Sequence, residues 1–480
     1  MLAPFSAPPA SPAPPVHRRG AVRRAAATLL TGLLTAGVLG TGVLTAAPAA
    51  AEEDGAPQVQ GGAAATLGGL KIYGTAVVHA DGGDQEVAAG LFEMSVDGGG
   101  TLQTYGVDLH APTQRDARYH EMPWSGTSLG ANKDAGRIRW ILQHSYPQVN
   151  DLAALARQAG AQGLTEQDAA AGTQVAVWRF SDHADVEAAD PQAEKLADYL
   201  VGSARKMPEP QASLVLDPPA VSGHPGERIG PVTVHTNAGG VTVTPPVDAA
   251  ISGVRIVDAA GRAVTSAADG SRLYVEVPAD AADGSAELTV QASTTVPVGR
   301  ALVSDSRSQT QILAGSSEST VSAAASAAWA EQGAIPALSA ARNCTEGALE
   351  ITAVNRGDEE FVFELMGVRH SIAAGASRAV TVPLQEDQPY DFSVSGPHGF
   401  RQRFAGVLDC RTQSSDSGLT AQTLSEPSPA TAGLASDGTD LAETGGSAVT
   451  PLIAGVAIGL VLIGGTVLLL LRGRSTASRG

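Results

Sequence analysis

Aromatic residues are scarce in this chain: Phe, Trp and Tyr make up 4% of its 480 residues, and charged residues make up 17%. So few large rings exclude one continuous aromatic core, yet a hydrophobic fraction of 43% is too high for a disordered chain. The chain also contains 55 Gly and 29 Pro. At roughly 100–200 residues per domain, these features favour two to four small domains, rich in β-structure and joined by linkers.

Positive charge is also in short supply, with 31 Lys and Arg against 49 Asp and Glu, a net charge of −18. Such an acidic surface repels phosphate backbones and excludes a nucleic-acid partner. The ten His show no metal-ligand spacing, and the chain has neither a nucleophile elbow nor a nucleotide-binding loop. We therefore expect no metal, no cofactor and no turnover enzyme.

Lysine is the rarest of the charged residues, and all four lysines lie in the first half of the chain: Lys71, Lys133, Lys195 and Lys206. The later β-rich segments therefore cannot form intramolecular Lys–Asn isopeptide bonds. Their stability has to come from packing and from any disulfide.

The N-terminal segment has the pattern of a secretory signal peptide, which we assign to residues 1–51. A basic stretch ends at Arg24, an apolar stretch covers 25–47, and small residues precede cleavage after Ala51. General secretion is favoured, and the Arg23-Arg24 pair leaves the twin-arginine route open. Residues 52–69 are interpreted as a linker.

Cysteine is limited to Cys344 and Cys410. Because an exported chain meets oxidising conditions, we predict a disulfide between them. By chain-entropy reasoning the long loop that it closes would contribute about 4 kcal/mol to stability. A metal-binding or catalytic thiol pair is the alternative, but neither cysteine has suitable partners nearby in the sequence.

The C-terminal segment, residues 441–480, combines three signals. An uninterrupted apolar run over 451–471 is long enough for a transmembrane helix, and Arg472 and Arg474 follow it. Just before it stands the pentapeptide Leu441, Ala442, Glu443, Thr444, Gly445. Together they resemble the LAXTG-type cell-wall sorting signal of Gram-positive surface proteins. The resemblance implies that a sortase cuts after Thr444 and joins it to peptidoglycan; a flexible juxtamembrane linker is the alternative.

The region between the two ends is predicted to be multidomain and mainly β. Residues 70–207 mix strands, near 72–78, 91–96 and 102–109, with three helices that begin after Asn150, Thr165 and Asp190. Alternating valines over 212–303 indicate a β-sandwich. A Ser- and Ala-rich linker, 304–339, precedes a second, disulfide-closed β-sandwich, 340–411, and a disordered stalk, 412–440.

Four short motifs in the first domain resemble the thioester (TQXA) domains of Gram-positive surface adhesins: Tyr105–His110, Pro123–Gly126, Ile141–Pro147 and Thr173–Trp178. The resemblance implies an α+β domain in which a strand cysteine bonds to the acyl carbon of the TQXA glutamine. Ammonia leaves as this thioester forms. A ligand amine then attacks the thioester and is captured covalently.

Gln174 occupies the glutamine position of that motif, but Gly106 stands where the family has cysteine. Glycine supplies no nucleophile, so we predict that this chain forms no thioester. The glycine is either a natural loss or a change particular to this sequence. Without the thiol, Gln174 can equally be a helix residue that is hydrogen-bonded in the core.

A pocket near the position of the missing thiol is predicted from Tyr105, Asp108, His110 and Thr173. Asp108 and His110 are expected on one strand two positions apart, where their side chains share a face. A solvated or capped strand edge is the alternative for this pair.

These features predict an exported, sortase-anchored cell-wall protein with an adhesin-like tip, which the membrane holds only before sorting. Its expected partners are the sortase, peptidoglycan through Thr444, and a surface protein or amine-bearing ligand that binds without a covalent bond. A structural wall spacer, or a covalent adhesin if the native sequence carries Cys at 106, are the alternatives. A binding tip should form a concave, partly apolar site around Gly106 and Gln174, whereas a spacer should fill it with packed side chains.

Overall fold

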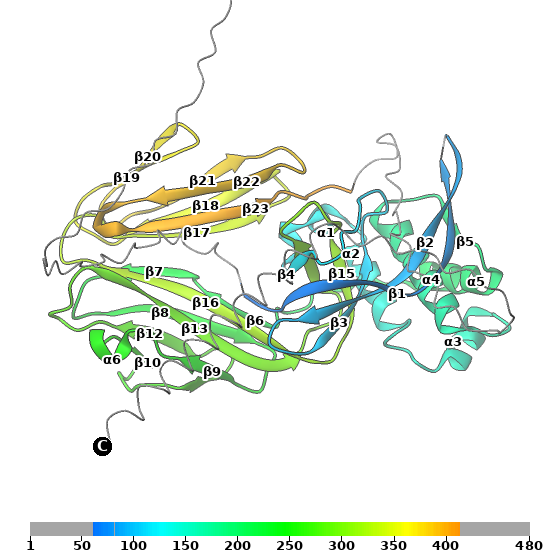
Figure 1. Cartoon of the computed structure of the whole chain (residues 1–480), viewed down its shortest axis with the longest axis horizontal. Helices are drawn as coiled ribbons and strands as arrows, with labels where there is room; N and C mark the ends of the chain where they lie inside the picture. Colours follow the sequence, from blue (N-terminus) through cyan, green and yellow to red (C-terminus); the bar gives the residue numbers. More distant parts are fainter. Residues whose placement is uncertain (1–60, 81, 413–480) are drawn as a thin grey trace, which may run out of the picture. The chain divides into compact units, whose positions relative to one another are not determined.

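The computed structural model describes residues 61–80 and 82–412, which form a mainly β chain (Figure 1). The predicted signal peptide, the sorting motif Leu441–Gly445, the apolar segment 451–471 and the stalk from residue 413 lie outside the described residues. Within the described part, no helix is long and apolar enough to cross a membrane. We refer below to a barrel domain, a sandwich domain and a C-terminal domain.

The barrel domain is built on a sheet of seven strands in the order β2-β3-β15-β14-β4-β1-β5. All its pairings are antiparallel, and β1 also pairs with β2, which closes a ring of six strands with β5 added alongside β1. The strands are β1 (Ala64–Ala80), β2 (Gly83–Val96), β3 (Thr101–Gly106), β4 (Arg118–Met122), β5 (Val186–Ala188), β14 (Ala301–Ser304) and β15 (Gln311–Ser316).

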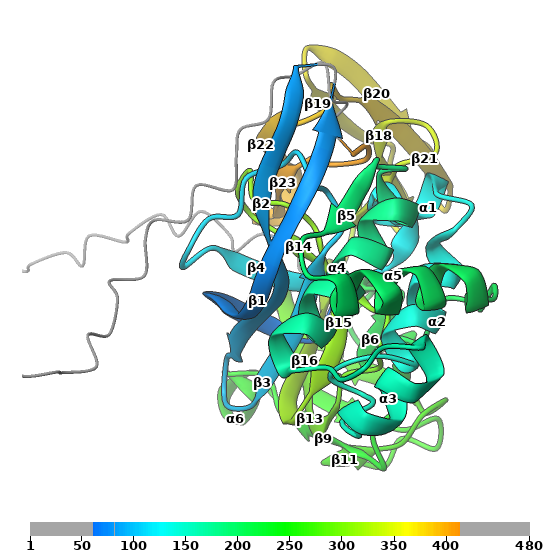
Figure 2. The same cartoon turned by 90° about the vertical axis from the view of Figure 1, so that its right-hand side faces the viewer.

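The helices of this domain follow β4, and Figure 2 shows α4 and α5 beside β1. They are η1 (Trp124–Gly126), α1 (Ser128–Ala131), α2 (Ala135–Gln143), α3 (Leu152–Ala159), α4 (Glu166–Ser181) and α5 (Pro191–Ser203). Thr165 and Asp168 form a capping box at the start of α4, and Asp190 caps α5, as predicted. Asp151, one residue after the predicted Asn150, caps α3.

Helix α4 is the central helix, since it packs against both β1 and β2 and also contacts α2 and α5. Every residue from Ala169 to Trp178 is buried. Gly172 allows the close approach of α5, because a Cβ there would lie 2.4 Å from the carbonyl oxygen of Ala193. This packing fixes the position of Gln174, which lies two residues further along the helix.

The sandwich domain contains a four-stranded sheet, β10-β12-β8-β6, and a five-stranded sheet, β11-β9-β13-β16-β7. The valines that alternate in the sequence point into the shared core, as predicted. Its elements are β6 (Leu214–Asp217), β7 (Ala220–Gly223), β8 (Arg228–Thr236), β9 (Val241–Thr244), α6 (Ala249–Ser252), β10 (Arg255–Val257), β11 (Ser266–Ala267), β12 (Arg272–Glu276), β13 (Gly284–Thr295) and β16 (Glu318–Trp329).

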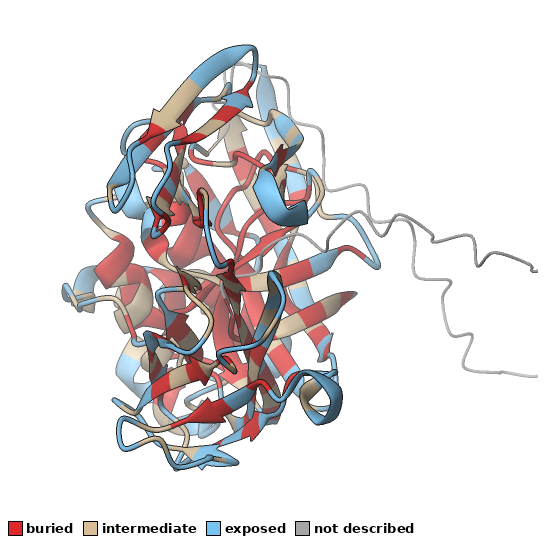
Figure 3. Ribbon diagram, turned by 90° about the vertical axis from the view of Figure 1, so that its left-hand side faces the viewer, coloured by how far each residue is buried: buried red, intermediate tan, exposed pale blue. Residues whose placement is uncertain are grey.

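The C-terminal domain is all β, and its buried strand faces enclose a core that contains Phe361 and Phe363 (Figure 3). The predicted Cys344–Cys410 disulfide is present, with an S–S distance of 2.00 Å. Its elements are β17 (Pro336–Asn343), β18 (Ala348–Asn355), β19 (Phe361–Leu365), β20 (Val368–Ile372), β21 (Ser377–Pro383), β22 (Pro389–Ser395), η2 (Pro397–Gly399) and β23 (Arg401–Val407).

The prediction of a linker over 304–339 is wrong, because most of this segment is strand. β15 inserts between β3 and β14 of the barrel, and β16 pairs along the whole of β13 in the sandwich. In β16 small buried alanines alternate with more exposed residues, a period of two that the Ser- and Ala-rich composition conceals. The predicted linker 52–69 likewise contains the start of β1, at Ala64.

The barrel domain is therefore discontinuous, with most of the sandwich inserted between α5 and β14. We predict that a fragment ending at residue 207 does not fold, because without β14 and β15 the edges of β3 and β4 are exposed. A fragment covering 61–330 restores both strands and should show dispersed amide resonances in an NMR spectrum. A well-dispersed spectrum from 61–207 would contradict this prediction.

Candidate functional site

Gly106 and Gln174, which the sequence analysis pairs, are in direct contact. The Gly106 N–H donates to Gln174 Oε1 at 3.0 Å, and Gln174 Nε2 donates to the Gly106 carbonyl oxygen at 2.8 Å. The carboxamide thus forms two hydrogen bonds with one backbone residue, and Gln174 is fully buried. The structure agrees with the alternative in which Gln174 is a hydrogen-bonded core residue.

The backbone groups of Gly106 can bind Gln174 because the pairing of β2 with β3 ends before Gly106. The register of β2 with β3 stops at Phe92 and Thr104, so no residue of β2 faces Gly106. On the other edge of β3, Gly106 is the partner of Gln311 in β15. The carboxamide of Gln174 therefore occupies the position where a further strand residue would pair, which satisfies buried backbone groups.

Tyr105 and Thr173 flank this contact and are both fully buried. The Tyr105 hydroxyl donates to the carbonyl oxygen of Tyr146 at 2.9 Å, and burial raises the Tyr105 pKa well above its usual value. Thr173 Oγ1 lies 2.6 Å from both Ser145 Oγ and the Ala169 carbonyl oxygen. These two side chains are thus packed and hydrogen-bonded, and they stabilise the site rather than forming an open pocket.

Gln309, which the sequence analysis does not identify, fills the space beside Gly106. A Cβ on residue 106 would lie 1.9 Å from Gln309 Oε1, a separation that requires the glutamine to move. Gln309 is itself 1% exposed, and its Nε2 donates to Thr113 Oγ1 at 2.5 Å. Its Oε1 is buried without a hydrogen-bond partner among the residues that the structure describes. The volume that a side chain at position 106 would need is thus already occupied.

Asp108 and His110 do not share a strand as predicted, because β3 ends at Gly106. Both lie in the loop that follows, where Asp108 Oδ1 accepts hydrogen bonds from the backbone N–H groups of His110 and Ala111 at 3.0 and 3.1 Å. Asp108 is therefore a buried loop cap. Burial lowers the His110 pKa, and His110 Nδ1 is buried with no partner among the described residues.

Asp182, at the C-terminal end of α4, lies near Asp108. Burial raises the pKa of Asp182 well above its usual value, and the charge of Asp108 adds to that shift. Ser181 Oγ donates to Asp182 Oδ2 at 2.7 Å, while Asp182 Oδ1 is buried and has no hydrogen-bond partner within 61–80 and 82–412. Asp108 and Asp182 thus form a pair of neighbouring carboxyl groups, one after β3 and one at the end of α4.

The C-terminal domain contacts the loop that holds Gln309. Thr310 Oγ1 donates to Asp409 Oδ2 at 2.9 Å, and the Cys344 N–H donates to the Ser125 carbonyl oxygen at 3.0 Å. Burial, followed by the nearby charges of Asp108, Glu386 and Asp387, raises the Asp409 pKa to about 7. The residues around the disulfide therefore help to hold loop 305–310 against the Gly106 site.

Glu386, Asp387 and Asp409 bring carboxylate oxygens within 4.8 Å of one another, the separation of a candidate cation site. Protein groups already bind two of these side chains. Glu386 Oε1 accepts from the backbone N–H groups of Cys410 and Arg411, and Asp409 accepts from Thr310. The cluster is thus explained by its role in holding the chain end after β23.

The chemistry open to this site is limited. The Gly106 N–H donates to the Gln174 side-chain carbonyl and polarises it, as an oxyanion-stabilising donor would. Residue 106 itself, however, has no side chain and supplies no thiol. Both cysteines of the chain are joined in the disulfide of the C-terminal domain.

We predict that Gly106→Ala destabilises the protein by about 1–3 kcal/mol, because Gln309 must leave its buried hydrogen bond to make room. Gln309→Ala should relieve most of that cost, a coupling that urea unfolding of the single and double variants would measure. The matched control is Gly163→Ala, where an added Cβ meets no atom within 4 Å. Additive effects of the two substitutions would show that Gln309 does not occupy this space.

We predict that Asp409 makes stability fall as pH rises from about 4 to about 7. An unfolded aspartate has a pKa near 4, so in this window the folded chain holds a proton that the unfolded chain has lost. Asp409→Asn should remove this slope from the difference between variant and parent in urea unfolding. The exposed Asp280 provides the control Asp280→Asn; equal slopes in all three proteins would contradict the prediction.

Comparison with known families places this geometry in context. Residues 103–206 match the family model of the thioester domain, in agreement with the predicted thioester-type domain. Residues 322–407 match the family model of the bacterial phospholipase C C-terminal domain. A search of curated proteins found no significant match.

Solved structures with similarity to this chain include two TIE proteins. The Bacillus anthracis TIE protein is 16% identical, with 72% of this chain and 64% of that chain covered and a TM-score of 0.26. The thioester domain of the Enterococcus faecium TIE86 protein is 15% identical, with coverages of 56% and 97% and a TM-score of 0.26. The E. coli chaperone DraB is 14% identical, with coverages of 41% and 98% and a TM-score of 0.18. This chain thus spans just under two thirds of the Bacillus anthracis protein.

Proposed function

We propose that this chain, whose residues 103–206 match the thioester-domain family, is an adhesin-like surface protein that binds without a covalent bond. The family match supports the kind of protein. The observation that carries the non-covalent part is that the residue in contact with the Gln174 carboxamide is Gly106, which has no side chain and so no thiol.

The absence of a nucleophile is the chemical reason for this proposal. Formation of a thioester needs a sulfur that attacks the Gln174 carboxamide carbon and expels ammonia. Gly106 has no side chain, and Gln309 fills the adjoining volume. An incoming amine would therefore meet an ordinary amide, which is far less reactive than a thioester.

Export and anchoring belong to the same proposal. The pattern of residues 1–51 supports secretion with cleavage after Ala51. The Leu441–Gly445 motif, followed by the apolar run 451–471 and two arginines, supports sortase attachment through Thr444. The protein would then be displayed on the cell wall and held by the membrane only before sorting. No catalytic turnover is part of this function.

A structural wall spacer is the second candidate function, and a specific observation favours it. Gly106, Gln174 and Tyr105 are all buried among packed side chains, as expected of a domain that merely folds. An adhesin-like function therefore requires a binding surface elsewhere on the chain.

The intact mass of the protein released from its native cell wall, with and without methylamine, tests the proposal. We expect a chain that begins at Glu52, ends in wall-linked Thr444 and has an unchanged mass after methylamine treatment. A mass lower by one ammonia, which rises when methylamine is added, would show a thioester and refute the non-covalent binding.

The double variant Gly106→Cys/Gln309→Ala is the informative comparison, since it supplies a thiol and clears space for it. Its thiol would expel ammonia from Gln174, and methylamine would then displace the thiol and leave an N-methyl amide.

Attachment of cells with and without the chain to host or matrix surfaces distinguishes the adhesin-like function from the structural spacer. Equal attachment would favour the spacer.

A further inference from the structure

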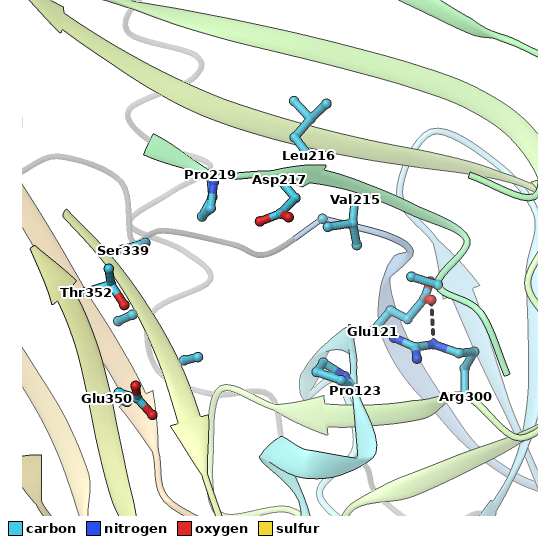
Figure 4. Close-up of a pocket in the computed structure, with 14 residues that line it drawn as sticks. Glu121, Pro123, Val215, Leu216, Asp217, Pro219, Arg300, Ser339, Glu350 and Thr352 are labelled. Atoms are coloured by element: carbon cyan, nitrogen blue, oxygen red, sulfur yellow. Dashed lines mark hydrogen bonds and ion pairs between the residues drawn. The ribbon is translucent and has the colours of Figure 1, made fainter. Parts of the chain in front are cut away.

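A second, open site lies where the three domains meet, away from Gly106. It is a pocket of about 460 Å³, which we call the junction pocket (Figure 4). The barrel domain contributes Glu121 and Arg300, the sandwich domain contributes β6, and the C-terminal domain contributes β17 and β18. The pocket is also lined by Val215, Leu216, Asp217 and Pro219 of the sandwich domain and by Ala341 and Glu350 of the C-terminal domain.

The barrel side of the junction pocket is held by a buried ion pair. Arg300 Nε donates to Glu121 Oε1 at 2.8 Å, and the two side chains are 5% and 1% exposed. Arg300 Nη1 donates to Glu209 Oε1 at 2.8 Å, and the Ser213 N–H donates to Glu121 Oε1 at 2.9 Å. Because these bonds join the barrel to the segment that leads into β6, this wall is formed before any ligand binds.

The other walls combine apolar surface with two carboxylates. Val215, Leu216 and Pro219 provide apolar surface on the sandwich side. Asp217 stands on the same side and Glu350 on the side of the C-terminal domain, as Figure 4 shows. Neither carboxylate makes an ion pair with any residue in the described part of the chain, although Glu350 Oε2 accepts a hydrogen bond from Asn343 Nδ2 at 3.5 Å.

The charge of the lining is unbalanced. Three carboxylates, Glu121, Asp217 and Glu350, face one guanidinium, that of Arg300, and the Glu121 carboxylate already accepts from it. Asp217 and Glu350 are thus the unpaired charges. Two carboxylates without an ion-pair partner leave the lining negatively charged, and a bound cation would lower the electrostatic energy of that lining. The lining therefore selects for positive charge on a ligand with an apolar part.

We propose that the junction pocket binds an organic cation with an ammonium group on a short aliphatic chain. The negative charge of Asp217 and Glu350 attracts the ammonium group into the pocket, and the chain contacts Val215, Leu216 and Pro219. Such a group occurs in free alkyl amines and in the lysine side chain of a protein partner. No covalent step is involved, so this site is independent of the thioester-type chemistry discussed above.

Calorimetric titration of the mature chain with butylamine, cadaverine and N-acetyl-lysine methylamide tests this proposal. We expect binding of these cations, and at least tenfold weaker binding to the double variant Asp217→Asn/Glu350→Gln. Binding only of butylamine and cadaverine would identify a free amine as the source. Binding of the lysine derivative as well would identify a side chain of a partner.

The matched control is Asp248→Asn/Glu346→Gln, which removes the same charge from two exposed residues outside the pocket lining. It should bind like the parent chain. Ala341→Trp, which fills the pocket without a change of charge, should abolish binding, and thermal unfolding would show that each variant is folded. Three results would overturn the proposal: no binding of any cation, equal binding of butanol, or equal binding by the Asp217 and Glu350 variant.

Discussion

The pairing of β15 with β3 is the constraint on which the rest of this structure depends. The partnership of Gln311 with Gly106 draws the chain back to the barrel after the sandwich domain and closes the ring of strands. It also carries loop 305–310 across the end of β3, where Gln309 fills the space beside Gly106 and Thr310 binds Asp409. The strand β15 thus completes the barrel, and the loop that leads into it fills the space beside Gly106 and helps to hold the C-terminal domain.

The two sites of the molecule contrast in how their polar groups are satisfied. In the Gly106 site the carboxamide of Gln174 is hydrogen-bonded to the backbone through both its oxygen and its nitrogen, and it is fully buried. In the junction pocket Asp217 and Glu350 line a cavity and make no ion pair with any described residue, because Arg300 is paired with Glu121 and Glu209. Satisfied buried groups have little to gain from a ligand, whereas unpaired charges gain from a cation. The residues that resemble the thioester family, around Gly106, and the proposed binding surface, the junction pocket, are therefore two different sites.

Much of the local structure was predictable because its causes lie within a few residues. The capping box of Thr165 and Asp168, the Asp190 cap of α5 and the alternating valines of the sandwich all follow from short spacings. The prediction of a linker was wrong where the composition concealed the alternation of buried and exposed residues. The Ala- and Ser-rich segment 318–329 is a strand, because alanine is small enough to pack on the inner face of a sandwich. Asp108 and His110 were misplaced because β3 ends at Gly106, before either residue.

The sequence by itself determined that position 106 offers no nucleophile, that Cys344 and Cys410 are the only cysteines available to pair, and that the central helix begins after Thr165. The tertiary structure alone decided that Gln309 fills the space beside Gly106 and that Asp217 and Glu350 line one cavity. The physical reason is range. Helix caps act within one turn, and a residue type acts at a single position. By contrast, the hydrogen bond from Gln309 Nε2 to the Ala111 carbonyl oxygen joins residues 198 positions apart in the sequence, and only the closed barrel brings them together.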